Sequence, residues 1–132
     1  MRGFTKRPQR SVTFTLGDES ITYTVHPLPL LFMPMVREMI PISEEMAKDT
    51  KSRVIERRCL AMIAEALRPS EDGLPAHPSP TASPEEWEAY TDTLSATFTG
   101  AGLTSKMVNT IGLAVDDLEG DSLQQLETAG ND

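Results

Sequence analysis

Few residues of this chain have the types and spacing that chemistry requires. Its imidazole and thiol groups belong to His26, His77 and Cys59, and no two of these are close together in the sequence. A metal site needs several such ligands, or carboxylates, converging at short spacing. The sequence therefore predicts neither a metal centre nor a bound cofactor.

The remaining candidates for catalysis have structural explanations. Cys59 falls on the apolar face of a predicted helix, where cysteine acts as a small hydrophobic residue rather than as an exposed nucleophile. The acidic pairs 44–45 and 85–86 lie at predicted helix starts, where the helix dipole favours them. The pair 116–117 lies near a predicted helix end, on a solvated face. We predict no catalytic residue and a protein that is not an enzyme.

Charge is distributed unevenly along the chain. Residues 1–68 hold eleven of the twelve Lys and Arg residues against eight acidic residues, whereas residues 69–132 hold Lys106 against twelve acidic residues. The second half would repel phosphate, and the overall net charge is −8, so nucleic acid is not the expected partner. The same polarity permits self-association between copies. Its simplest explanation is solubility alone.

Two basic clusters are candidates for contacts with nucleic acid. Neither is interleaved with aromatic residues, and acidic residues dilute the second one. The clusters are an N-terminal group and a group on a predicted helix: Arg2, Lys6, Arg7 and Arg10, and Lys51, Arg53, Arg57 and Arg58. We expect the second cluster to give its helix a basic outer surface.

Composition favours a soluble, cytoplasmic protein. The start of the chain carries basic residues without the apolar stretch of a secretory signal. The longest apolar stretch, 26–36, is too short and too rich in proline to cross a bilayer, which needs about 20 apolar residues. A single cysteine excludes an internal disulfide and fits a reducing compartment. Membrane association is not expected.

Two alternating segments predict an N-terminal β-hairpin over residues 11–26. β-branched and aromatic residues alternate with threonine on both sides of a short loop that contains Gly17 and Asp18. The predicted apolar face consists of Val12, Phe14, Leu16, Ile21, Tyr23 and Val25. An isolated hairpin is marginal in water, so another element must cover this face.

The hairpin is followed by a broken hydrophobic connector over residues 27–42. Pro34 and Pro41 predict short turns over 30–40 with a break at 40–42, rather than one smooth helix. We expect Leu28, Leu31 and Phe32 to face inward and cover the hairpin. Methionine adapts to varied partner shapes, so the surplus apolar residues form a candidate partner-binding surface: Leu30, Met33, Met35, Val36, Met39 and Met46.

The rest of the chain is predicted to be helical. Ser43 is the expected N-cap of a helix over 43–67, whose apolar stripe runs through Ile55, Cys59, Met62, Ile63, Ala66 and Leu67. A proline-rich surface loop occupies 68–83. Ser83 then caps a helix over 84–99, and a further helix over 104–119 ends at Gly120.

These segments define a mainly helical α+β protein. We predict a flexible basic arm over 1–10, one domain over 11–118 and a polar tail over 120–132. In the domain the hairpin packs on a bundle of three to four helices.

This layout resembles that of the tail assembly chaperones of long-tailed bacteriophages. The features that carry the resemblance are a threonine-rich hairpin, the stretch TYTVHPLPL, a helical remainder and an acidic close. The resemblance implies a non-enzymatic chaperone in the host cytoplasm that binds hydrophobic helices of a tape measure protein and recruits tail tube subunits. It carries over no site residue.

Two alternatives remain open. One is a structural neck or tail subunit of the virion that self-associates through its opposed charges. The other is a small bacterial adaptor protein.

Overall fold

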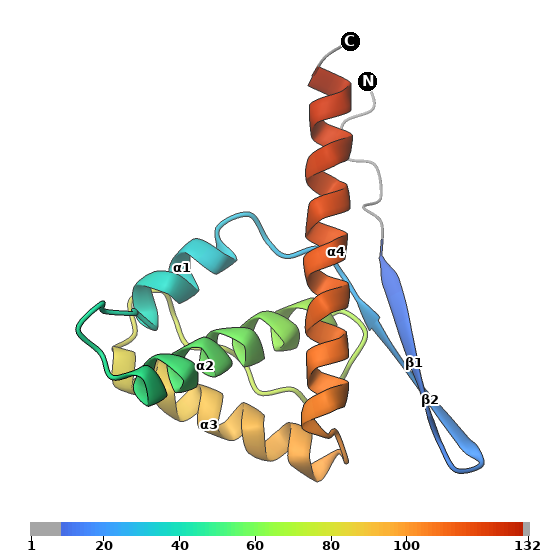
Figure 1. Cartoon of the computed structure of the whole chain (residues 1–132), viewed down its shortest axis with the longest axis horizontal. Helices are drawn as coiled ribbons and strands as arrows, with labels where there is room; N and C mark the ends of the chain where they lie inside the picture. The colour runs from blue at the N-terminus through green and yellow to red at the C-terminus, as the bar shows by residue number, and fades with distance from the viewer. Residues whose placement is uncertain (1–8, 131–132) are drawn as a thin grey trace.

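The computed structural model describes residues 9–130, with side chains described as far as Glu119. It confirms a mainly helical α+β fold with an N-terminal hairpin. The strands are β1 (Arg10–Leu16) and β2 (Glu19–Val25), and the helices are α1 (Phe32–Met39), α2 (Lys48–Leu67), α3 (Pro84–Gly100) and α4 (Ser105–Gly130). Figure 1 shows α1, α2 and α3 on one side of α4 and the hairpin on the other.

The hairpin has the predicted alternation and a tight turn. The strands are antiparallel, and Leu16 pairs with Glu19, which leaves a loop of Gly17 and Asp18. Gly17 has a φ of 65°, and a glycine with positive φ at the first loop position is what a type II′ turn requires. This turn suits the right-handed twist of the strands, so the register follows from local sequence.

The hairpin is covered by α4 and α2, not by the connector as we expected. α4 packs against both strands, α2 packs against β2, and α1 packs against α2. Val25 is fully buried, while Leu16 near the tip remains 48% exposed. Proximity in the sequence did not predict this packing, because the chain after Val25 passes α4 and places α1 against α2, away from the strands (Figure 1).

The short turns predicted over 30–40 are wrong, because Pro34 lies in the first turn of α1, and α1 ends where the break over 40–42 was expected. The first backbone N–H groups of a helix have no partner within it, so a proline there costs no hydrogen bond. The first amide to bond within this turn is that of Met35, which donates to the Leu31 carbonyl at 3.2 Å. Pro34 therefore starts a helix instead of interrupting one.

Two predicted helix boundaries are also wrong. Ser43 does not cap α2, because it closes a separate turn in which Met46 N donates to Ser43 O at 3.2 Å and Glu45 N donates to Ser43 Oγ. The helix begins at Lys48 after Ala47. At the other end of the chain, α4 continues through Gly120 to Gly130, since one glycine costs a helix only about 1 kcal/mol.

These findings also change the predicted terminal segments. The polar tail predicted over 120–132 is helical as far as Gly130. Arg10, assigned to the flexible arm, begins β1, and the rest of the arm over 1–8 lies outside the described residues.

The boundaries of α3 follow the prediction closely. Ser83 is the N-cap, and its hydroxyl oxygen accepts a hydrogen bond from Glu86 N at 3.3 Å. At the C-terminal end, Gly102 has a φ of 86°, and Leu103 N donates to Phe98 O at 3.0 Å. This six-to-one bond across a left-handed glycine is a Schellman motif.

One apolar core joins the hairpin and the four helices. The predicted apolar face of α3 is buried along its length, from Trp87 to Phe98. The predicted stripe of α2 is buried or packed against the core except at Ile55, which is 56% exposed. The buried surface is wider than predicted, because Ala61 and Ala64 are also fully buried. Arg57 and Arg58, predicted to lie on the outer surface, are half-buried.

Gly112 of α4 lies where α2 approaches closely, a contact that the sequence did not reveal. A Cβ atom at this position would lie 3.5 Å from Cys59 Sγ and 3.6 Å from Ile63 Cδ1. Both distances are ordinary van der Waals contacts. The helix therefore has room for one methyl group here, but not for a large side chain.

We expect Gly112→Ala to raise the free energy of unfolding by about 0.5–1 kcal/mol, because alanine has the higher helix propensity and its methyl group fits. Denaturant melts of the two proteins measure this difference. Gly112→Leu should destabilise by overpacking. A destabilised alanine variant would show that the two helices are closer than described.

Candidate protein-interaction surface

The candidate surface lies on α1 and on the residues that lead into it. Phe32, Val36 and Ile40 follow one another at a spacing of four and are buried against the core, as is Leu28. Burial of each such side chain contributes roughly 1.5–3 kcal/mol. A helix of eight residues is too short to be stable alone, so this buried face holds α1 in place.

The six predicted surface residues do not share one environment. Val36 is fully buried and belongs to the core, so the expectation that it contacts a partner is wrong. Met33, Met35 and Met39 are half-buried and pack against the core, and Met46 is half-buried in the turn before α2. Leu30 is 85% exposed.

Leu31, which we expected to face inward, is 72% exposed. Leu30 and Leu31 are the two most exposed large hydrophobic residues among those described. Leu31, Met35 and Met39 are spaced four residues apart, so they follow one edge of α1 beside its buried face. Together with Leu30 they form what we call the α1 edge.

Polar contacts hold both ends of this segment. At its start, Leu28 N donates to Glu119 Oε1 of α4 at 2.8 Å. At its end, Arg58 of α2 donates from Nε to Ile40 O at 2.7 Å and from an Nη atom to Arg37 O at 3.4 Å. The last carbonyls of a helix lack partners within it, so Arg58 satisfies the C-terminal end of α1.

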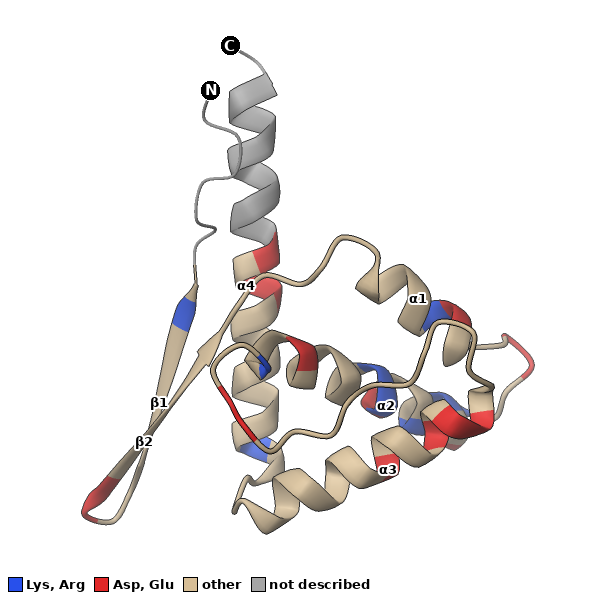
Figure 2. Cartoon of the chain, turned by 180° about the vertical axis from the view of Figure 1, so that it is seen from behind, with Lys and Arg blue, Asp and Glu red and all other residues tan. Residues whose placement is uncertain are grey.

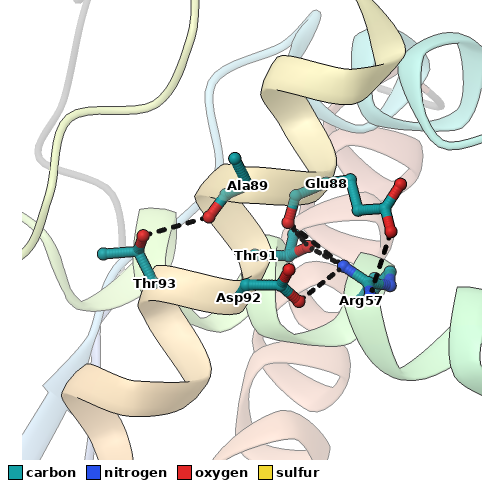
Figure 3. A network of polar contacts seen from close by, with 6 residues as sticks. All are labelled: Arg57, Glu88, Ala89, Thr91, Asp92 and Thr93. Carbon is teal, nitrogen blue, oxygen red and sulfur yellow. Dashed lines mark hydrogen bonds and ion pairs between the residues drawn. The ribbon is translucent and has the colours of Figure 1, made fainter.

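Arg57, the neighbour of Arg58, joins α2 to α3 (Figure 3). It donates to Thr91 Oγ1 at 2.8 Å and to Glu88 O at 3.1 Å, and it pairs with Asp92 at 3.0 Å. Thr91 is 1% exposed, and its hydroxyl donates a hydrogen bond to Glu88 O at 3.0 Å. Arg57 and Arg58 of the second basic cluster therefore form hydrogen bonds within the fold.

Charges from the two halves of the sequence meet in the structure (Figure 2). Arg57 lies beside acidic residues of α3, and Arg10 pairs with Asp117 of α4 at 3.5 Å. The opposite charges of the two halves are thus partly used within one copy of the chain. This reduces the charge available for association between copies.

The proline-rich loop 68–83 is tied to the body by His77. The His77 ring stacks on Trp87 at 5.9 Å between centroids and meets the edge of Phe32 at 5.6 Å. Its Nε2 atom lies 3.6 Å from Glu65 Oε2. Sequence reasoning placed His77 on a surface loop and missed this role, because no local pattern marks it.

Glu65, Arg68 and Tyr90 extend the contacts around His77. Arg68 pairs with Glu65 at 3.4 Å, donates to Pro75 O at 3.0 Å and donates to Tyr90 Oη at 3.0 Å. Burial raises the pKa of Tyr90; Glu65 adds to this, and Arg68 opposes it. These groups face one another across α2, the loop and α3, so they stabilise the fold and present no open reactive centre.

Cys59 is also poorly suited to nucleophilic chemistry. It is half-buried against α4, and burial raises the pKa of its thiol, to which Asp116 and Glu56 contribute. A raised pKa lowers the thiolate fraction at neutral pH, and the thiolate is the reactive form. The predicted packing role fits this environment.

Replacement of Arg58 by methionine should lower the free energy of unfolding by about 1–2 kcal/mol, because it leaves the last carbonyls of α1 without a charged donor. Methionine keeps an apolar stem, so the change isolates the guanidinium. Arg53→Met, at an exposed position of the same helix, is the matched control for denaturant melts. Equal stabilities of the two variants would contradict the capping role.

The stability of the fold should fall as the pH rises above about 10, the usual pKa of tyrosine. The pKa values of Tyr90 and Tyr23 are raised in the folded protein. The unfolded chain therefore loses these protons first, and deprotonation favours unfolding. Denaturant melts from about pH 8 to pH 11 measure the slope. Tyr90→Phe should make it shallower, and an unchanged slope would remove Tyr90 as a cause.

No family model, curated protein or solved structure matched this chain. Among the described residues, no helix is long and apolar enough to cross a membrane. The described residues also contain no group of three or more His, Cys, Asp or Glu side chains that could hold a metal ion. The functional assignment therefore rests on the α1 edge itself.

Proposed function

We propose that this chain is a non-enzymatic tail assembly chaperone of a long-tailed bacteriophage. In this function the α1 edge binds apolar helices of the tape measure protein in the host cytoplasm, before tail tube subunits assemble. The observation that carries the proposal is the pair of adjacent leucines, Leu30 and Leu31, which are exposed although the helix that follows them is firmly anchored.

The α1 edge suits an apolar helix as its ligand. Helices bind to grooves and edges through side chains spaced three and four residues apart, and Leu31, Met35 and Met39 have the matching spacing. Methionine is adaptable, which favours binding to many similar helices in succession. Arg37 and Glu38 are the exposed charged residues of α1. Because their charges are opposite, they favour neither an acidic nor a basic ligand.

The structural-subunit alternative is less well supported. It relies on opposite charges at the two ends of the sequence, and several of these charges pair within the chain, at Arg57 and Arg10. Mass spectrometry of purified particles separates the two functions. A chaperone should be absent from the virion, whereas a structural subunit should be present in stoichiometric amount.

The double variant Leu30→Asp, Leu31→Asp tests the proposal in cells that produce the phage tail proteins. Both side chains are exposed, so the variant should melt as cooperatively as the unchanged protein. It should lose partner affinity by about 3 kcal/mol or more, roughly a hundredfold, because two leucines are no longer buried. The measurement is the amount of tape measure protein that co-purifies, quantified by mass spectrometry.

The matched control is Leu113→Asp, because Leu113 is 66% exposed on α4, away from α1. This variant should retain the partner. Retention by the double variant, or equal loss in the control, would contradict binding at the α1 edge. Recovery of a different, bacterial protein by the unchanged chain would favour the adaptor alternative.

A further inference from the structure

The outer edge of β1 lacks the features by which proteins protect a free strand. In the described part of the chain the sheet has two strands, so β1 pairs with β2 on one side and with no strand on the other. Its residues from Ser11 to Leu16 contain no charge and no proline, and its register runs without a bulge. Edge strands of this kind pair readily with another strand.

The turn geometry identifies the backbone groups on this outer edge. A type II′ turn closes with a hydrogen bond between its first and fourth residues, here Leu16 and Glu19. Hydrogen-bonded and non-hydrogen-bonded pairs alternate along an antiparallel ladder. The N–H and C=O groups of Ser11, Thr13 and Thr15 therefore point away from β2, toward the free edge.

β1 is complementary to a second copy of itself in the antiparallel direction. The register that pairs all seven residues places Thr13 opposite Thr13 of the other copy and Ser11 opposite Thr15. All outward backbone groups then find partners, in about six hydrogen bonds. The exposed hydroxyl face and the apolar face of each hairpin continue into those of the other, because paired residues lie on the same face of a sheet.

We propose that two copies of this chain associate through antiparallel pairing of their β1 edges into one four-stranded sheet. The strands are short, so the dimer is weak and depends on concentration. It forms without any tail partner. Dimer formation can therefore be measured on the purified chain alone. Its result does not depend on whether the α1 edge binds a tail protein.

Sedimentation velocity over a wide range of concentrations measures the association. The unchanged protein should shift from monomer to dimer. Thr13→Lys places two like charges directly opposite each other at the symmetry axis, so it should weaken the dimer by roughly tenfold or more. Thr22→Lys is the matched control, since Thr22 is exposed on the same face and pairs with Thr13 but lies one strand away from the axis.

A mixture of Thr13→Lys and Thr13→Glu provides the decisive result, because opposite charges at the axis should restore association. Circular dichroism melts confirm that each variant is folded. A monomeric unchanged protein at all concentrations, equal weakening by the two lysine variants, or no recovery in the mixture would each overturn the proposal.

Discussion

The position of α1 depends on a continuous series of ring contacts that begins at Phe32. Phe32 meets His77 of the proline-rich loop, His77 stacks on Trp87 of α3, and Trp87 meets Tyr90 at 5.7 Å. Trp87 is fully buried, so the series ends in the core. An eight-residue helix has little stability of its own, and these contacts fix it to two other elements. Without them, Leu30 and Leu31 would lead into a loose segment.

Arginine side chains supply the polar half of this framework. Arg58 closes the C-terminal end of α1, Arg57 bridges α2 and α3, and Arg68 joins α2 to the loop and to Tyr90. Arginine can bury its stem while its guanidinium bonds to several oxygens at once. α2 supplies Arg57 and Arg58, and Arg68 directly follows its last residue. Because α2 also packs against α1, α3, α4 and β2, it is the centre of the fold. Arg57 and Arg58 thus bond within the fold, where the sequence predicted a basic outer surface.

Local signals in the sequence were sufficient for the elements whose geometry is local. The alternation around Gly17, the capping serine of α3 and the left-handed Gly102 each specify their structure within a few residues. Pro34 and Gly120 misled because their effect depends on position within a helix. Their residue types alone do not reveal that position.

The candidate site was harder to predict than the fold. The sequence indicated the segment that contains the exposed leucines. Which of its side chains are exposed depends on the rotation of α1 about its axis. That rotation is set by contacts with α2 and with His77, which are distant in the sequence. Val36 and Leu31 accordingly exchange their expected environments: the first is buried and the second exposed. Arg57 and Arg58 were placed on the outer surface because they lie off the predicted stripe of α2, and their partners on α3 and at the end of α1 are distant in the sequence.

The central claim is that an anchored α1 presents its exposed edge to an apolar helix of a tail protein. The most direct measurement is photo-crosslinking from position 31 in phage-producing cells, with position 113 as the reference, followed by mass spectrometry of the products. The claim predicts crosslinks from position 31 to a helical segment of the tape measure protein, and few from position 113. Crosslinks from position 31 only to other copies of this chain, or the same products from both positions, would contradict it.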